Sequence, residues 1–362
     1  MRRMLPAVVI LALAAALAPA AAGRPRTLAV TPGPIAAFAQ DGGRVAWAGT
    51  EPGSACPWRV RVLTLATGVR AAINRNGGPT CRDDLGFQPQ AVGGSVQLAL
   101  AGTRAIWTLI ASGNFRYVSV MTASLGNRAD VRLEELVYQY GFGEGDHLGS
   151  VAGDGPTLAY SRVATSAVEV GDCFDQGTCE TPVVGGGLAR VVGRATVPVP
   201  GAPPAVLVAV SGRNAALVPA AQGGESPSAA PGGPVEIRNA TTGALVASFS
   251  PAGLVTAVAL SSRLAAVLVE TAGGTRIEWY ATATGAPLGS KAAAGAAPLL
   301  SASGDLIVFR TGRKIRLLDT AGGTTRVLAT AAATPIGLSI EGRRVAWAES
   351  VADHGQVRAV RV

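Results

Sequence analysis

Residues that are able to do chemistry gather in one short segment, residues 137–147 (VYQYGFGEGDH). Aromatic residues make up only 5% of the chain and charged residues 15%, yet this segment combines both kinds. Aromatic faces bind sugars and apolar groups, carboxylates accept hydrogen bonds from hydroxyl groups, and an aspartate beside a histidine is able to hold a cation. The segment is therefore a candidate ligand-binding site, with the alternative that its tyrosines complete a strand and its glycines shape a loop. Its candidate binding residues are Tyr138, Tyr140, Phe142, Glu144, Asp146 and His147.

The four cysteines are candidates for disulfide bonds or for a metal site. An even number of cysteines is typical of disulfide-bonded exported proteins. A thiolate zinc site is the alternative, but the sequence has no CxxC pair and only two histidines. We therefore predict disulfides between sequence neighbours, Cys56 with Cys81 and Cys173 with Cys179, and expect no metal.

Catalytic signatures are absent from the sequence. It contains no G-x-S-x-G, H-E-x-x-H, EF-hand loop or phosphate-binding glycine loop. The acidic residues beside the cysteines are expected to solvate disulfide loops rather than to abstract protons. We therefore expect no catalytic residue and no cofactor. These acidic residues are Asp83, Asp84, Asp172 and Asp175.

The N-terminus has the pattern of a secretory signal. Arg2 and Arg3 precede an apolar run over residues 5–17, and small residues follow up to Ala22. A membrane anchor is the alternative, but the run is shorter than the ~20 apolar residues that a bilayer-spanning helix needs. We therefore predict a signal peptide over residues 1–22, cleaved after residue 20 or 22, and no membrane insertion after cleavage. The mature protein is expected to be secreted, periplasmic or associated with the cell envelope.

The chain has a positive net charge, but its basic residues are not clustered along the sequence. The formal net charge is +8, but only Lys291 and Lys314 are lysines and no run of basic residues is present. Proteins that follow a nucleic-acid backbone carry clustered Lys and Arg. Nucleic acid is therefore excluded as an expected partner.

Seven segments repeat one pattern of a glycine, an apolar strand and a large side chain, which we call the anchor. In most repeats a second, alternating strand follows, with a glycine eight residues after its start, as in Val60 to Gly68 and Val118 to Gly126. A β-sandwich with accidental repetition is the alternative, but a glycine that recurs in register six times argues against it. The repeats predict an all-β, seven-bladed propeller of four-stranded blades over residues 23–362. The anchors are Trp47, Trp107, Tyr160, Leu217, Val267, Phe309 and Trp347, with glycine five residues earlier in all but one and Ser262 in the other.

The two ends of the chain are expected to meet in one blade. The seventh repeat ends at residues 357–362, after its third strand, and residues 26–31 precede the first repeat where a fourth strand would lie. A shift of 300 residues aligns Arg26 and Trp47 with identical residues later in the chain. We therefore predict that the N-terminal strand closes the last blade, which leaves no open sheet edge.

The long connections should all lie on one face of the propeller. Because successive strands are antiparallel, connections between second and third strands and between blades share one face, whereas the remaining turns share the other. Loops on a rigid scaffold commonly carry function, so the face with the long connections is the expected binding face. The arginines of the short turns are expected to be solvated, with an anion-attracting ring as the alternative. The long connections span 50–58, 77–94, 137–149, 164–187 and 220–233, and the turn arginines are Arg44, Arg104, Arg213, Arg263, Arg343 and Arg344.

Two repeats, AQDGGRVAWAG (39–49) and VAGDGPTLAYSR (151–162), carry a family resemblance. They resemble the exported WD40-like propellers of the TolB type, whose repeats have a Pro-Asp-Gly turn before an apolar strand that ends in an aromatic residue. The resemblance covers nearly all of the chain after residue 22. No repeat keeps the Pro-Asp pair, and neither the Gly-His nor the Trp-Asp dipeptide of WD40 repeats occurs. The resemblance implies interaction rather than catalysis, at the level of the fold.

These observations favour a monomeric, non-catalytic extracytoplasmic binding or scaffold protein. Its expected partner is a protein or a glycan of the cell envelope or the extracellular space. The alternatives are a propeller enzyme acting on an extracellular glycan or lactone, as a lyase or hydrolase, and a purely structural envelope protein. Acidic residues that converge with His147 near the mouth of the central channel would favour the enzyme.

Overall fold

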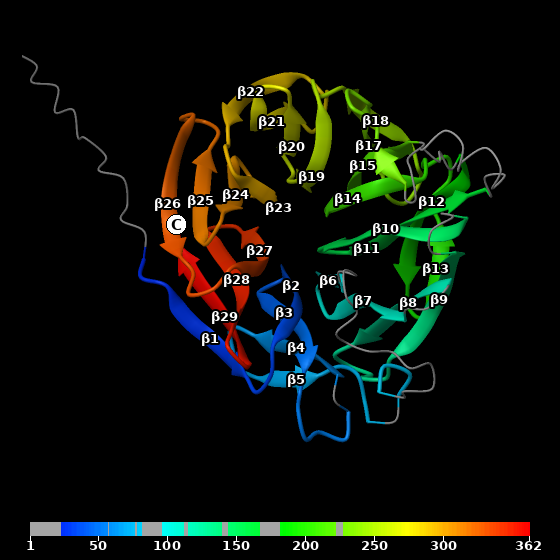
Figure 1. The fold of residues 1–362 in the computed structure, drawn as a ribbon, viewed down its shortest axis with the longest axis vertical. Helices are drawn as coiled ribbons and strands as arrows, with labels where there is room; N and C mark the ends of the chain where they lie inside the picture. Colours follow the sequence, from blue (N-terminus) through cyan, green and yellow to red (C-terminus); the bar gives the residue numbers. More distant parts are fainter. Residues whose placement is uncertain are drawn as a thin grey trace, which may run out of the picture.

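The computed structural model describes residues 23–56, 58–76, 78–81, 96–111, 115–139, 144–166, 182–221 and 227–362. Over these residues the chain forms antiparallel strands and no helix, so the all-β prediction is confirmed. Figure 1 shows the sheets arranged around a central axis, with strands such as β2, β19 and β27 on the inside and β1, β22 and β26 on the outer rim. The predicted signal segment, residues 1–22, and both Cys173 and Cys179 lie outside the described residues.

Five of the sheets are built on four antiparallel strands in chain order, apart from the one that includes the N-terminal strand. One contains β2 (Ile35–Asp41), β3 (Arg44–Thr50), β4 (Trp58–Thr64) and β5 (Arg70–Ala72). The next contains β14 (Ala205–Ser211), β15 (Asn214–Ala221), β17 (Val235–Asn239) and β18 (Leu245–Phe249), with the short β16 (Ser228–Ala229) paired to β15. Another contains β19 (Leu254–Leu260), β20 (Leu264–Thr271), β21 (Gly274–Ala281) and β22 (Pro287–Ala292). The fourth contains β23 (Ala296–Ser303), β24 (Leu306–Thr311), β25 (Lys314–Asp319) and β26 (Thr324–Thr330). The fifth contains β27 (Pro335–Glu341), β28 (Arg344–Val351), β29 (His354–Arg361) and β1 (Arg26–Thr31).

The largest sheet has eight strands in two halves. Among the described residues, the ladder between β9 and β10 has the single pair Gly145 and Tyr138, and the positive φ of 125° at Gly145 is a backbone conformation that favours glycine. Each half therefore resembles the four-stranded sheets elsewhere in the ring. The first half contains β6 (Leu98–Ala101), β7 (Arg104–Ala111), β8 (Phe115–Ser124) and β9 (Val131–Gln139), and the second contains β10 (Gly145–Asp154), β11 (Thr157–Thr165), β12 (Val183–Val192) and β13 (Ala195–Pro198).

The anchors hold neighbouring sheets together. Each anchor lies on the second strand of its sheet or half-sheet, and each has at most 3% of its surface exposed. Each also belongs to a buried apolar cluster that it shares with the preceding sheet or half-sheet, as Trp107 does with Trp58. Trp47 shares its cluster with Ala346 and Val357 of the last sheet, so the packing continues around the ring. Burial of a large apolar side chain contributes roughly 1.5–3 kcal/mol, which explains why these positions stay apolar.

The N-terminal strand completes the sheet of the C-terminal strands, as the 300-residue correspondence predicts. β1 pairs with β29 from Arg26 opposite Ala359 to Thr31 opposite Gly355. Ala29 is 1% exposed, and the Thr31 hydroxyl accepts a hydrogen bond from the Gly355 amide at 3.0 Å. This pairing covers the edge of β29 that would otherwise be open to another chain.

The recurring glycine is required by the turn between the first and second strands. In all six repeats that have it, φ lies between 54° and 59°, a left-handed conformation that costs other residues roughly 1–2 kcal/mol. The repeat that lacks it uses a side chain instead, because the Ser261 hydroxyl accepts hydrogen bonds from the amides of Arg263 and Leu264. The glycines are Gly42, Gly102, Gly155, Gly212, Gly304 and Gly342.

The prediction that Gly126 ends the turn after its strand is wrong. In the turns after β4, β17 and β21, a left-handed glycine donates its amide to the carbonyl four residues earlier, as Gly68 does to Thr64. After β8 the same bond joins Arg128 to Ser124, and Arg128 has the left-handed φ of 49°, whereas Gly126 does not. Because β8 extends further than its counterparts, Val120 rather than Val118 corresponds to Val60.

The two faces of the ring differ in the length of their connections. One face, here the short-turn face, carries the turns after first and third strands, such as residues 42–43 between β2 and β3. The other, the long-connection face, carries the connections that follow second and fourth strands, such as residues 51–56 after β3 and residues 73–76 after β5. The expected connection at 137–149 is mostly strand, because β9 extends to Gln139 and β10 begins at Gly145.

Candidate functional site

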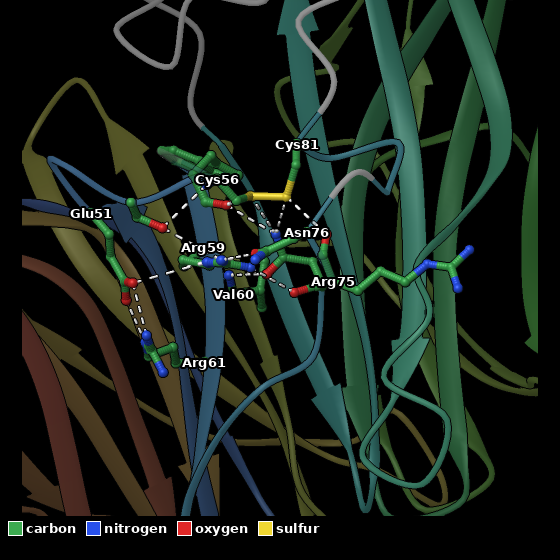
Figure 2. A network of polar contacts seen from close by, with 11 residues as sticks. Glu51, Cys56, Arg59, Val60, Arg61, Arg75, Asn76 and Cys81 are labelled. Atoms are coloured by element: carbon green, nitrogen blue, oxygen red, sulfur yellow. Dashed lines mark hydrogen bonds and ion pairs between the residues drawn. A yellow bond between two sulfur atoms is a disulfide. The ribbon is translucent and has the colours of Figure 1, made fainter.

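A disulfide braces two connections of the long-connection face. Cys56 and Cys81 are bonded, as predicted, with their Cα atoms 4.9 Å apart (Figure 2). Asn74 fixes the chain beside them, because its side-chain oxygen accepts a hydrogen bond from the Val60 amide at 2.9 Å and its side-chain nitrogen donates to the Trp58 carbonyl at 2.9 Å. Cys56 is fully buried, so the bridge connects residues after β3 to residues after β5 from within. Within the described residues no cysteine is free.

Two arginines extend this network toward the surface (Figure 2). Arg59 donates to the Asn74 carbonyl at 3.0 Å and to the side-chain oxygen of Asn76. Arg61 holds the Glu51 carboxylate with two nitrogens, one of them 2.8 Å from Oε2, and this ion pair raises the pKa of Arg61. A bidentate pair of this kind adds binding energy and also fixes the orientation of the two side chains. Together the two arginines of β4 hold the connections after β3 and after β5 in one arrangement.

The same loop is tied to the next half-sheet. The carboxylate of Asp130, which is 2% exposed, accepts a hydrogen bond from the Thr80 amide at 2.9 Å. Gly78 packs closely on the other carboxylate oxygen of Asp130. The disulfide loop is thus fixed at both ends, which reduces the ordering cost of any contact made there.

Part of the predicted ligand segment is an interior contact. His147 is 5% exposed, and its ring stacks on Tyr138 with centroids 4.2 Å apart. The Nε2 atom of His147 lies 3.1 Å from the Thr165 hydroxyl, which also donates to the Gly145 carbonyl at 3.1 Å. The structure therefore brings Tyr138 and His147 together between β9, β10 and β11.

The acidic residues of the segment lie nearer the surface. Glu144 is exposed, and Asp146 is half-buried close enough to Arg162 to raise the pKa of that guanidinium. The larger effect on Arg162 comes from Glu134, 2.5 Å away, which also accepts a hydrogen bond from the Tyr160 hydroxyl at 2.5 Å. Tyr140 and Phe142 lie outside the described residues.

Two exposed aromatic residues were missed by the sequence pattern. Phe115 and Tyr117 on β8 are 45% and 38% exposed. Side chains two residues apart share a face of a strand, so Phe115 and Tyr117 lie on the same face of β8 as Met121, and Val118 lies on the other face. Met121 packs in the apolar cluster shared with the β2–β5 sheet. The alternation in FRYVSV was a usable signal, but no acidic residue lies near it, so it lacks the mixed aromatic and acidic composition of residues 137–147. Aromatic side chains therefore lie on both sides of the β6–β9 half.

Acidic residues do converge, but on the short-turn face and without His147. Asp41 accepts hydrogen bonds from the amides of Gly102 at 2.5 Å and Gly155 at 3.1 Å, so it spans the turns of both halves of the large sheet. Asp154 accepts from the Gly212 amide at 2.6 Å. Burial raises the pKa of Asp154, and the nearby Asp41 raises it further. These carboxylates cap turn amides, which is a structural role.

Most turn arginines are likewise occupied. Arg44 and Arg104 donate to main-chain carbonyls of the following turns, with Arg104 Nη1 2.9 Å from the Val191 oxygen. Arg263 pairs with Asp305 at 2.6 Å, and Arg343 donates to the Val362 carbonyl at 2.6 Å. These contacts do not support an evenly charged ring of free arginines.

Metal sites and membrane-spanning helices are not found in the described part of the chain. No group of three or more His, Cys, Asp or Glu residues there is arranged to hold a metal ion. Nor does that part of the chain contain a helix of the length and apolarity needed to cross a bilayer.

Comparison with known proteins identifies the fold. No family model matches the sequence, and no curated protein matches it. Among solved structures, a chain of the mitotic checkpoint complex is similar over 100% of this chain and 98% of its own, at 13% identity and a TM-score of 0.51. The WD40 β-propeller domain of Doa1 matches 93% of this chain and 97% of its own, at 11% identity and a TM-score of 0.47. BamB from Moraxella catarrhalis matches 91% of this chain and 85% of its own, at 12% identity and a TM-score of 0.43. The chain therefore has a WD40-like β-propeller fold.

Proposed function

We propose that this chain is an exported, non-catalytic binding protein that recognises a protein or a glycan on the long-connection face of a seven-bladed propeller. The observation that carries the proposal is the exposure of Phe115 and Tyr117 on β8, in the half-sheet to which Asp130 ties the disulfide loop. Exposed aromatic side chains with ordered surroundings are characteristic of binding surfaces. A WD40-like fold commonly presents such surfaces, although the fold by itself does not assign a partner.

The seven-blade count rests on the halves of the large sheet and on the core. The single residue pair between β9 and β10 supports counting β6–β9 and β10–β13 as separate blades. The buried residues of the described chain group into seven clusters, each drawn from two neighbouring sets of four strands. One cluster for each blade interface is what a closed ring of seven blades requires.

Export is supported by the cysteines and by the N-terminal pattern. The Cys56–Cys81 bridge is a kind of bond that persists in oxidising compartments. A signal peptide over residues 1–22 would deliver the propeller, residues 23–362, to such a compartment. The partner is accordingly a molecule of the cell envelope or the extracellular space, and the protein acts as a monomer.

The binding surface includes both sides of the second blade. Phe115 and Tyr117 extend toward the first blade, and the Tyr138 and His147 stack lies on the side of the third blade. The stack gives the neighbouring segment a rigid base, from which Tyr140, Phe142, Glu144 and Asp146 would contact the ligand. A surface of this aromatic and acidic composition suits a sugar ring or an apolar protein side chain.

Site-specific crosslinking tests this surface. A photoreactive phenylalanine analogue at position 117 is expected to crosslink a defined partner in native cells, whereas the same analogue at Leu288, an exposed residue on β22, is not. Phe115→Ala with Tyr117→Ala should weaken capture of that partner by at least ~10-fold, as expected when central aromatic contacts are lost. The matched control is Leu288→Ala with Val327→Ala, which removes exposed apolar surface elsewhere. Equal capture by both double variants would refute the assignment of the surface.

A further inference from the structure

A hollow lined by arginines opens where the two ends of the chain meet. It has a volume of about 390 Å³ and lies at β1, β28 and β29. Volumes of roughly 300–1,000 Å³ are typical of small-molecule sites. The hollow is distant in the fold from the aromatic surface, because it lies at the start of β28 and the end of β29, on the side of the short turns. Its lining residues are Gly23, Arg24, Arg26, Arg344, Ala359, Val360 and Arg361.

Strand register explains why the arginines converge. Arg361 pairs directly with Arg344, and Ala359, two residues before Arg361, pairs with Arg26. Residues two apart share a face of a strand, so Arg26, Arg344 and Arg361 lie on one face around the small side chain of Ala359. The Gly23 amide donates to the Arg361 carbonyl at 3.2 Å, which extends the pairing. Small Ala359 in the middle leaves the volume that the long side chains surround.

The charges in the hollow are poorly balanced. Arg344 pairs with Glu341 at 2.5 Å, and that carboxylate also accepts the Gly43 amide at 2.9 Å. Among the described residues, the guanidinium groups of Arg24, Arg26 and Arg361 have no ion pair or hydrogen bond, and all three residues are exposed. Three guanidinium groups of the hollow thus have no anionic partner among the described residues. Like charges that are held together repel, and a bound anion removes that repulsion.

We propose that this hollow is a binding site for a phosphate-bearing ligand. Guanidinium groups present forked pairs of N–H donors that match the oxygens of phosphate, and several forks from different strands suit a group with three or more acceptor oxygens. The site forms only when β1 pairs with β29, since Arg24 and Arg26 come from one end of the chain and Arg361 from the other. Binding therefore connects the two termini and stabilises the closed ring. The phosphate is carried either by a small soluble molecule or by an anionic polymer of the cell surface. In both cases the guanidinium groups bind the phosphate oxygens in the same way.

Calorimetric titration of the purified protein with inorganic pyrophosphate tests the proposal. Arg26→Gln with Arg361→Gln should raise the dissociation constant at least about tenfold, because two charge-assisted contacts are removed. The matched control is Arg194→Gln with Arg213→Gln, which removes the same charge from exposed positions on other sheets. Circular dichroism melting confirms that each variant is folded, which is expected because the substituted side chains are exposed.

The outcomes separate a site from general electrostatics. Weaker binding in the Arg26 and Arg361 variant alone supports the proposal, whereas an equal loss in the control, or no pyrophosphate binding by the unaltered protein, overturns it. A second titration with a glycerol phosphate polymer identifies the source. Tighter binding of the polymer that depends on the same two arginines assigns the ligand to a polymer, and tighter binding of pyrophosphate assigns it to a small molecule. Retention of the Phe115 and Tyr117 crosslink in the arginine variant shows that this site is independent of the proposed binding surface.

Discussion

The carboxyl groups of Asp41 and Asp154 lie close enough for the charge of Asp41 to raise the pKa of Asp154, although they stand at the ends of β2 and β10 in different sheets. Each also accepts the amide of a turn glycine in a following set of strands, at 2.5 Å for Gly102 and 2.6 Å for Gly212. Two carboxylates that lie close together repel each other, so the protonated form of one of them is favoured. The raised pKa of Asp154 therefore makes the stability of this contact between sheets sensitive to pH.

The first prediction is that acid stabilises this contact. Burial, and then the negative charges of Asp41 and Glu341, raise the pKa of Asp154. Between the ordinary carboxyl pKa and the raised value, the folded state holds more protons than the unfolded state, so the free energy of unfolding falls as pH rises. Asp154→Asn keeps an oxygen for the Gly212 amide and removes the titration, and it should flatten that slope. Urea unfolding from about pH 4 to about pH 7 measures the effect, with the exposed Asp353→Asn as control. An unchanged slope in Asp154→Asn would contradict the assignment.

The second prediction concerns the bridge between Cys56 and Cys81. It closes a loop with a sequence separation of 25, and in the chain-entropy model such a cross-link contributes about 3 kcal/mol by restricting the unfolded chain. Cys56→Ser with Cys81→Ser should lower the free energy of unfolding by about that amount. Non-reducing peptide mapping checks the linkage, and the same mapping tests Cys173 with Cys179, whose shorter loop should contribute less. Four free thiols in secreted protein would refute both assignments.

The third prediction is that the ring depends on its N-terminal strand. A protein that starts at Pro34 lacks β1, exposes the edge of β29 and loses the buried Ala29 and Thr31. We expect a lower melting temperature and concentration-dependent association through the open edge. A protein that starts at Arg26 keeps the whole of β1 and is the matched control. If the two truncated proteins melt alike, the closure contributes nothing to stability.

The fourth prediction is a stabilising substitution. Arg128 occupies the left-handed position that glycine holds in equivalent turns, and its amide makes the same bond to Ser124. Arg128→Gly should stabilise the protein by about 0.5–1 kcal/mol, because the steric cost of a side chain at positive φ exceeds the entropy that glycine adds to the unfolded chain. Gly68→Ala is the reciprocal change, and open space around its Cβ position means that only backbone strain is added. Chemical denaturation should give opposite signs for the two variants, and a loss of stability in Arg128→Gly would show that its side chain has a further role.

The sequence was sufficient for the strands and turns but not for the convergence of side chains. The anchors and the left-handed glycines, such as Trp47 and Gly42, were predictable because each depends on a local backbone conformation or on burial. The inward position of His147 depends on its pairing partners across two strands, which no local pattern specifies. The arginine hollow depends on register between the ends of the chain. The predicted pairing of residues 26–31 with the last sheet would locate the hollow only if it also specified that Arg26 lies opposite Ala359.

The last prediction separates the two parts of the proposed binding surface. Tyr140→Ala, Phe142→Ala and Asp146→Ala together should weaken capture of the crosslinked partner by at least ~2 kcal/mol, as expected for central aromatic contacts, while the melting temperature changes little. His147→Ala should instead lower the melting temperature, because it removes a buried ring that stacks on Tyr138 and contacts Thr165. Thr67→Ala, in the turn between β4 and β5 on the opposite face, is the control and should leave capture unchanged. Full capture by the triple variant would limit the site to Phe115 and Tyr117. Equal loss of capture in the turn control would place the site elsewhere, because residues on opposite faces of the ring do not contact one small ligand together.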